Sequence, residues 1–209
     1  FNLEIDKALV YVDSFRCKNE DFLLYLEKQD GVWTLVDHIA LSSLQISPNF
    51  GRILFETNRD GNQEIYMVNP DGSDPLNLTK STAIDFSPTW SPDRNSIAYN
   101  SGIGGNAEIF ILDLENMQTI NITNNPAKDW EPNWSLDGSQ IVFFTDRDGF
   151  SEIYTLMLDS LAPQRLTTSD FYDRQPAWSP NGNQIAFSSD QDGDWEIFLM
   201  DKNGMNEIN

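Results

Sequence analysis

The sequence predicts an all-β protein, a β-propeller made of four-stranded antiparallel blades. Four glutamates recur every 44 residues, each followed by Ile and an aromatic residue: Glu64, Glu108, Glu152 and Glu196. Three tryptophans keep the same spacing within Pro-x-Trp-Ser motifs: Trp90, Trp134 and Trp178. No unit contains a helical pattern of useful length. An uninterrupted repeat of about 40–45 residues with short β-rich runs is typical of propeller blades.

Turn signals separate the expected strands of each unit, illustrated here by one of them. The Asp-Gly pair at 137–138 precedes a short β-rich run at 141–143. The next Asp-Gly pair, at 148–149, predicts a hairpin, because Gly tolerates positive φ between two apolar runs. We expect a second strand at 152–158 and a third strand that carries the Leu-Thr pair at 166–167. A loop then leads to the Pro-x-Trp-Ser strand, which we expect to be innermost.

The repeat predicts a single domain that spans residues 1–209, because repeated units bury a common core only by packing on one another. The first unit is a degenerate copy, in which Glu20 falls in the glutamate column. The chain is slightly shorter than five complete units. It therefore fits a closed ring of about five blades or part of a six- or seven-blade ring. The expected blades lie at approximately 1–44, 45–88, 89–132, 133–176 and 177–209.

The chain carries a net charge of −20, from 33 acidic and 13 basic residues. This charge repels polyanions, so we expect no nucleic acid partner and no attraction to an anionic membrane surface. No stretch approaches the roughly 20 apolar residues that a membrane span needs. Cys17 is the only cysteine, which excludes an internal disulfide. The charge favours either solubility alone or a partner with basic groups.

Few residues offer catalytic chemistry. His38 is the only histidine, it lies in the degenerate unit, and no nucleophile elbow accompanies it. One histidine is also too few for a histidine-based metal site. These observations give no candidate for a serine-hydrolase triad or for a histidine-based metal centre.

The repeated columns themselves have structural explanations. The tryptophans fall at one blade position, where a large ring fills the space between adjacent sheets. The glutamates fall beside the hairpins, where each carboxylate can accept hydrogen bonds. We therefore expect both columns to stabilise the blades.

Two strings resemble the bacterial WD40-like (PD40) repeat of TolB propellers. One is Pro-Ala-Trp-Ser-Pro-Asn-Gly at 176–182, and the other combines Asp-Arg-Asp-Gly at 146–149 with Glu-Ile-Tyr at 152–154. The resemblance covers roughly residues 50 to 205, and more weakly residues 1 to 49. Leu136 departs from the pattern, because it stands where the repeat has Pro.

The resemblance implies a TolB-like propeller that binds other proteins rather than catalysing a reaction. It also implies a periplasmic or otherwise extracytoplasmic location, and thus a scaffold of the cell envelope. The same repeat occurs in propellers attached to serine peptidases. The alternatives are therefore the propeller domain of a larger hydrolase or peptidase, or a calcium- or carbohydrate-binding module.

Aromatic residues that break the repeat are the first candidates for a binding site, because functional residues concentrate on loops. They occupy slots that hold other residue types in the neighbouring units, all on the face that carries the Asp-Gly hairpins: Trp130, Phe150, Phe171, Tyr172 and Trp195. Exposed Trp and Tyr side chains are typical anchors of protein interfaces. Acidic residues accompany them on that face. We therefore expect a protein partner that brings apolar anchors and basic neighbours, unless some of these rings fold beneath the loops.

A column of aspartates lies three residues before each Pro of the Pro-x-Trp-Ser motif: Asp85, Asp129 and Asp173. The loop that carries them leads into the innermost strand, near the expected mouth of the channel. A ring of carboxylates there could hold a basic side chain of the partner or a cation. The alternative is a turn-forming Asp that bonds its own backbone.

Two Asp-x-Asp-Gly strings resemble the opening of a calcium-binding EF-hand loop, through Asp146, Asp148, Asp190 and Asp192. An EF-hand loop needs 12 residues and ends in a bidentate Glu. The nearest glutamates follow too early, and the rest of the pattern is missing. We therefore expect no cofactor, with Ca²⁺ as the alternative.

Overall fold

The computed structural model describes residues 7–12, 22–29, 32–40, 45–46, 51–102 and 105–209. The chain divides into two compact units, Phe1–Pro88 and Thr89–Asn209, and each is described by itself. Every strand ladder with a defined register in the described residues is antiparallel, as the sequence predicts. No helix in these ranges has the length and apolar character required to cross a membrane.

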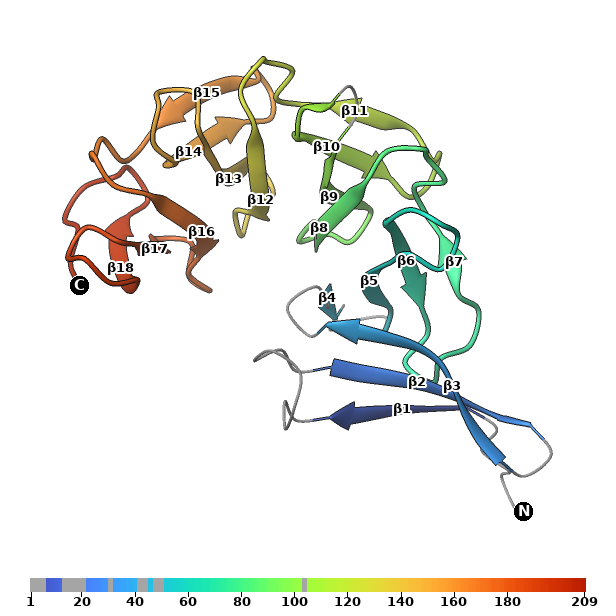
Figure 1. Cartoon of the computed structure of the whole chain (residues 1–209). Helices are drawn as coiled ribbons and strands as arrows, with labels where there is room; N and C mark the ends of the chain where they lie inside the picture. The colour runs from blue at the N-terminus through green and yellow to red at the C-terminus, as the bar shows by residue number, and fades with distance from the viewer. Residues whose placement is uncertain (1–6, 13–21, 30–31, 41–44, 47–50, 103–104) are drawn as a thin grey trace. The chain divides into compact units, whose positions relative to one another are not determined.

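The first unit contains two sheets whose strands follow in chain order (Figure 1). The expected first blade, 1–44, appears in its described part as a three-stranded sheet, with strands β1 Lys7–Val12, β2 Phe22–Gln29 and β3 Val32–Ala40. The second sheet has four strands: β4 Gln45–Ile46, β5 Ile53–Thr57, β6 Glu64–Val68 and β7 Leu76–Asn77. Four of its buried apolar side chains form a cluster: Ile53, Phe55, Tyr66 and Val68.

Three further sheets follow, and the first strand of this series, β8, begins in the last residues of the first unit. The sheet β8-β9-β10-β11 comprises Asp85–Trp90, Ser96–Ser101, Glu108–Asp113 and Thr119–Asn121. The sheet β12-β13-β14-β15 comprises Asp129–Trp134, Gln140–Thr145, Glu152–Met157 and Ala162–Arg165. The sheet β16-β17-β18 comprises Asp173–Trp178, Gln184–Ser189 and Glu196–Asp201. Repeated four-stranded antiparallel sheets confirm the predicted propeller architecture.

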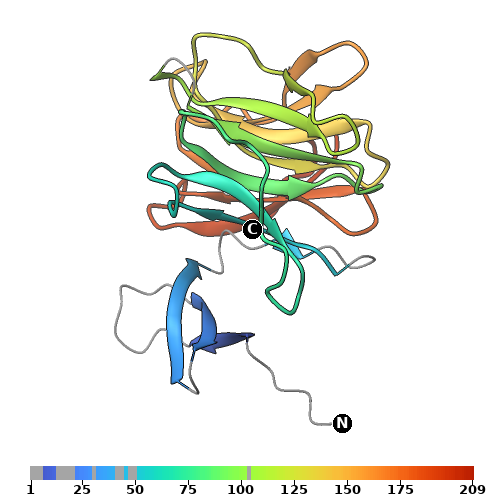
Figure 2. The same ribbon diagram turned by 90° about the vertical axis from the view of Figure 1, so that its right-hand side faces the viewer.

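Neighbouring sheets of the second unit lie side by side and share apolar cores (Figures 1 and 2). Successive side chains of a strand point to opposite faces. Ile141 and Phe143 of β13 therefore enter the core shared with β9 and β10. Val142 and Phe144 enter the core shared with β17 and β18. A strand that is buried on both faces explains why β13 reads as an unbroken apolar run.

The tryptophan column contributes to these cores, as predicted. Trp134 packs against the cluster between the β8–β11 and β12–β15 sheets, and Trp178 packs against the next cluster. Both rings are partly buried. Their position at the end of the innermost strand places them where two sheets meet.

Two members of the glutamate column, Glu108 and Glu152, tie the segment after the third strand to the second strand, in line with the predicted structural role. Glu196, in the last sheet, is exposed. The buried carboxylate of Glu152 accepts hydrogen bonds from Thr167 Oγ1 and Arg165 Nη2, each at 2.6 Å. Thr167 Oγ1 in turn accepts the backbone N–H of Ile153 at 2.9 Å. The equivalent glutamate of the preceding sheet, Glu108, makes the same bond to its threonine at 2.6 Å.

The threonine hydroxyls also explain where one prediction was wrong. The third strand was expected to carry the Leu-Thr or Ile-Thr pair, yet β15 ends at Arg165 and β11 ends at Asn121. Thr167 and Thr123 accept a strand N–H through the side chain, where a regular ladder would use a backbone carbonyl. The regular strand therefore ends just before each pair.

The Asp-Arg-Asp-Gly hairpin is built around a tyrosine. The guanidinium of Arg147 lies 4.7 Å from the ring centre of Tyr154 and 5.7 Å from that of Phe143. The phenol of Tyr154 donates a hydrogen bond to Asp148. Burial and then this bond raise the pKa of Tyr154 to about 12. Gly149, with φ of 111°, closes the turn.

Replacing Thr167 with Val tests the clamp between Glu152 and Thr167. The substitution keeps the shape but leaves the Ile153 N–H and the Glu152 carboxylate without the hydroxyl. We expect the free energy of unfolding to fall by about 1–3 kcal/mol. Thr168→Val, at an exposed neighbour, should change it by less than about 0.5 kcal/mol. Denaturant titration measures both, and equal losses would contradict the clamp.

Replacing Tyr154 with Phe tests the hairpin through pH. The pKa of Tyr154 is raised in the folded state, from about 10 in the unfolded chain to about 12. Its contribution to stability is therefore fully present below about pH 10 and is lost as the pH rises toward 12. Unfolding experiments from pH 8 to 11.5 should show a smaller loss in Tyr154→Phe than in the parent chain. An identical loss in both proteins would be the contrary result.

Candidate functional site

Four side chains of the second unit form a continuous row on the hairpin face, here called the aromatic ladder: Phe150, Tyr172, Arg174 and Trp195. Phe150 belongs to the β13–β14 hairpin, and its ring meets that of Tyr172 edge-on, with 5.2 Å between the ring centres. The guanidinium of Arg174, on β16, lies 5.1 Å from the Tyr172 ring centre and 5.3 Å from that of Trp195. Trp195 comes from the β17–β18 hairpin. Three loops therefore contribute to one surface.

The rings of the ladder face solvent. Phe150 is 38% exposed, Tyr172 40% and Trp195 51%, and the neighbouring Phe171 is 42% exposed. Four of the five aromatic residues predicted from the broken repeat are therefore accessible on the loops. A large ring held half-exposed contributes less to the core than a buried one, because less apolar area leaves water.

The neighbouring blades show what Phe150 replaces. The equivalent residue in the preceding sheet is Asn106, whose amide donates to the carbonyls of Asn125 and Ala127 at 2.7 and 2.9 Å. Asn62 makes the same bridge one repeat earlier. These amides tie each hairpin to the loop that enters the next sheet. Phe150 cannot make these hydrogen bonds, and its exposed ring instead contacts the ring of Tyr172.

Trp130 differs from the other predicted aromatic residues. Its ring stacks on Phe144, with 5.0 Å between centres and 24° between planes. It packs against the core that joins the β12–β15 and β16–β18 sheets. Trp130 therefore lies beneath the loops as part of the core, because the side chain starts from a strand face that the next sheet covers.

Arg174 was not among the residues predicted from the sequence. It occupies the slot that holds Trp130 in the preceding repeat, and its Nε atom is buried without a hydrogen bond. The sequence offered one signal: Arg174 is a cation at a repeat position that holds aromatic residues in the preceding units. In the structure it lies between two aromatic side chains. Cation–π contacts with two rings give this arginine its position.

The aspartate column lies inside the loops. Asp85, Asp129 and Asp173 are all buried. Their carboxylates accept hydrogen bonds from the residue four positions earlier, namely Ser81 at 2.7 Å, Asn125 at 2.6 Å and Ser169 at 3.0 Å. Asp129 also binds Arg147 at 2.9 Å. These bonds come from side chains, not from the aspartates' own backbone as the turn-forming alternative requires. Binding to a partner would require accessible oxygens, and these residues are buried.

Other acidic side chains remain exposed around the ladder. The hairpins and the loop before β16 carry Asp148, Asp170, Asp192 and Asp194, all exposed. Glu131 lies deeper, where burial raises its pKa and the charge of Arg174 partly opposes that effect. The ladder is thus an apolar strip with one cation and an acidic border.

The residues considered for Ca²⁺ have other contacts. Asp146 accepts the backbone N–H of Lys128 at 2.9 Å, and Asp190 accepts that of Tyr172 at 2.8 Å. Asp148 accepts the Tyr154 phenol and lies 3.3 Å from Arg165. Asp192 is exposed at the tip of its hairpin. Among the described residues, no group of three or more His, Cys, Asp or Glu side chains is arranged to hold a metal ion.

Comparison with solved structures gives the same fold. A putative TolB from Agrobacterium tumefaciens is 23% identical with a TM-score of 0.76, over 97% of this chain and 79% of that one. TolB from Acinetobacter baumannii is 18% identical with a TM-score of 0.76, over 97% of this chain and 50% of that one. A puromycin-hydrolyzing peptidase from Mycobacterium tuberculosis is 13% identical with a TM-score of 0.67, over 97% and 38%. At these identities the similarity shows the fold alone.

Comparison with curated proteins gives no match. The family model of the TolB beta propeller domain, PD40, matches residues 101–208, which is just over half of the chain. The matched segment contains the aromatic ladder and, apart from Ala98, the residues of both shared cores of the second unit. The chain belongs to the TolB beta propeller domain (PD40) family.

Proposed function

We propose that this chain is a non-catalytic scaffold of the cell envelope, periplasmic or otherwise extracytoplasmic, that binds a protein partner through the aromatic ladder and Phe171. The exposed ladder is the observation that carries the proposal. Phe150, Tyr172 and Trp195 come from three separate loops, and each breaks the repeat that explains its neighbours. Exposed side chains that break the repeat and gather on one surface are best accounted for by binding.

The chemistry of the ladder favours a protein interface. Protein interfaces are enriched in Trp, Tyr and Arg at their energetic centres, and a rim of less important contacts excludes water around them. The ladder offers two of these aromatic types and an arginine within contact distance of each other. Its side chains are suited to stacking and apolar contact rather than to reaction.

The acidic border points to the charge of the partner. Exposed carboxylates surround the rings, and the whole chain carries a charge of −20. Complementary charge speeds association and disfavours partners of the same sign. The expected partner therefore places apolar side chains on the ladder and basic side chains at its border.

The second candidate function is the propeller of a larger hydrolase or peptidase. The similarity to a peptidase, of which this chain spans only 38%, supports it. The length of the native polypeptide separates the two proposals, because a hydrolase requires a catalytic segment in the same chain.

Capture of partners from a cell-envelope extract tests the scaffold. We compare the parent chain with Tyr172→Ala/Trp195→Ala and identify bound proteins by mass spectrometry. A control variant, Met117→Ala/Ile120→Ala, removes two exposed apolar side chains away from the ladder, one in the β10–β11 turn and one on strand β11. The partner's dissociation constant should rise at least about tenfold in the ladder variant, since anchor residues contribute about 2 kcal/mol or more. The control should bind as the parent does.

Added salt should weaken the same complex, because exposed charges are screened. Binding that is equal in the ladder variant and the parent would contradict the proposed surface. A chain that captures no protein at all would contradict the scaffold itself. Thermal unfolding of each variant verifies that lost binding does not reflect lost structure.

A further inference from the structure

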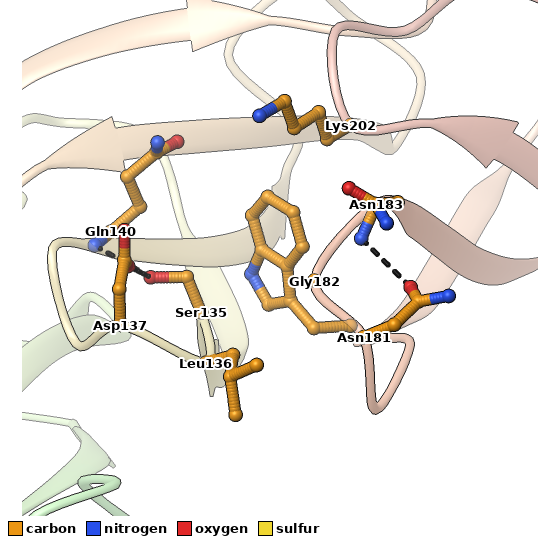
Figure 3. Close-up of a pocket in the computed structure, with 9 residues that line it drawn as sticks. Ser135, Leu136, Asp137, Gln140, Asn181, Gly182, Asn183 and Lys202 are labelled. Atoms are coloured by element: carbon orange, nitrogen blue, oxygen red, sulfur yellow. Dashed lines mark hydrogen bonds between the residues drawn. The ribbon is translucent and has the colours of Figure 1, made fainter.

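A hollow lies at the end of the β12–β15 and β16–β18 sheets that is opposite to the ladder. Its volume is about 240 Å³. The turn between β12 and β13 forms one side, with Asp137 and Gln140, and the turn between β16 and β17 forms the other, with Asn183 (Figure 3). Lys202, which follows β18, closes the hollow, and the indole of Trp178 lines it.

The hollow exists because Lys202 breaks the repeat. The equivalent residues one and two repeats earlier are Leu158 and Leu114. Leu158 packs against the core between its own sheet and the preceding one. A lysine in this position keeps its ammonium group in water and leaves the apolar space unfilled. Lys202 is accordingly exposed.

Internal hydrogen bonds hold the two turns that frame the hollow. Asp137 Oδ1 accepts Ser135 Oγ at 2.7 Å and the backbone N–H of Ser139 at 3.0 Å. The opposite turn is held in the same way, because Asn181 Oδ1 accepts the backbone N–H of Asn183 at 3.0 Å.

Four of the polar groups around the hollow have unused bonding capacity within the described part of the chain. No hydrogen bond to another described residue uses the second carboxylate oxygen of Asp137, the amides of Gln140 and Asn183, or the ammonium of Lys202. The indole ring is therefore bordered by two amides, which both donate and accept hydrogen bonds, by a carboxylate oxygen, which accepts, and by an ammonium group, which donates. This set matches hydroxyl groups, which both donate and accept.

We propose that this hollow binds a single neutral sugar ring, a pyranose, in which the hydroxyls meet the four polar groups and the C–H surface lies against Trp178. Its volume lies below the roughly 300–1,000 Å³ of sites for drug-sized ligands, which suits one ring. A neutral ligand is also favoured by charge, since the field of this acidic chain opposes an anionic sugar. The site is separate from the aromatic ladder and does not depend on the proposed scaffold function.

Saturation-transfer NMR on the whole chain tests this site with methyl glucoside, N-acetylglucosamine and cellobiose as neutral probes. Galacturonic acid serves as the charged probe. At least one neutral probe should bind, with a dissociation constant in the millimolar range. Galacturonic acid should bind at least about tenfold more weakly than that probe.

The decisive variant is Lys202→Leu, which restores the residue type of the repeat and fills the hollow. It should weaken sugar binding at least about tenfold, equivalent to about 1.4 kcal/mol, and leave thermal stability unchanged or higher. Asn183→Ala should weaken binding without filling the hollow. Lys128→Leu makes the same charge change at the opposite end of the sheet and should bind as the parent does.

Three results would overturn the site. These are the absence of binding by every neutral probe, undiminished binding by Lys202→Leu, and binding of galacturonic acid as tight as that of the neutral sugars. Because the ladder variant leaves this hollow untouched, sugar binding by Tyr172→Ala/Trp195→Ala separates this inference from the proposed scaffold.

Discussion

The packing of one sheet against the next is the interaction on which the structure depends. A four-stranded sheet of this size cannot bury its own apolar faces, so each repeat is stable only through its neighbours. In the second unit, alternate side chains of β13 enter two different cores, with Phe143 on one side and Phe144 on the other. The spacing of 44 residues keeps these faces in register from blade to blade. A shift of the strand by one residue would turn each side chain to the opposite face. Neither core would then receive the side chains that fit it.

Buried polar groups then fix the ends of the strands. Glu152 with Thr167 fastens the third strand, and Asp129 with Asn125 fastens the loop into the innermost strand. Because these bonds satisfy the backbone and the carboxylates locally, the loop surfaces are free to vary. A residue that departs from the repeat there, such as Phe150, changes the surface without opening the core, whereas Lys202 leaves a hollow beside Trp178. The residues that hold the blades together are thus different from the residues that are available for binding.

Much of this arrangement was predictable from the sequence, and the failures have identifiable causes. Periodicity alone located the glutamate and tryptophan columns, since each member recurs at the same position of its repeat. It did not show that Thr167 ends the third strand early, because that depends on a hydroxyl replacing a carbonyl. It also did not separate Trp130 from Phe150, because Trp130 starts from a face of β12 that the next sheet covers, whereas Phe150 lies in a hairpin loop. Arg174 was missed because its partners, Tyr172 and Trp195, meet only in space.

The central claim is that the ladder residues do not support the fold. Phe150→Asn tests it most directly, since Asn106 shows how an amide in this slot bridges to the following loop. We expect the free energy of unfolding, measured by denaturant titration, to stay within about 0.5 kcal/mol of the parent value or to rise. A fall of about 2 kcal/mol or more, the size expected for a truncated core residue, would show instead that Phe150 belongs to the core.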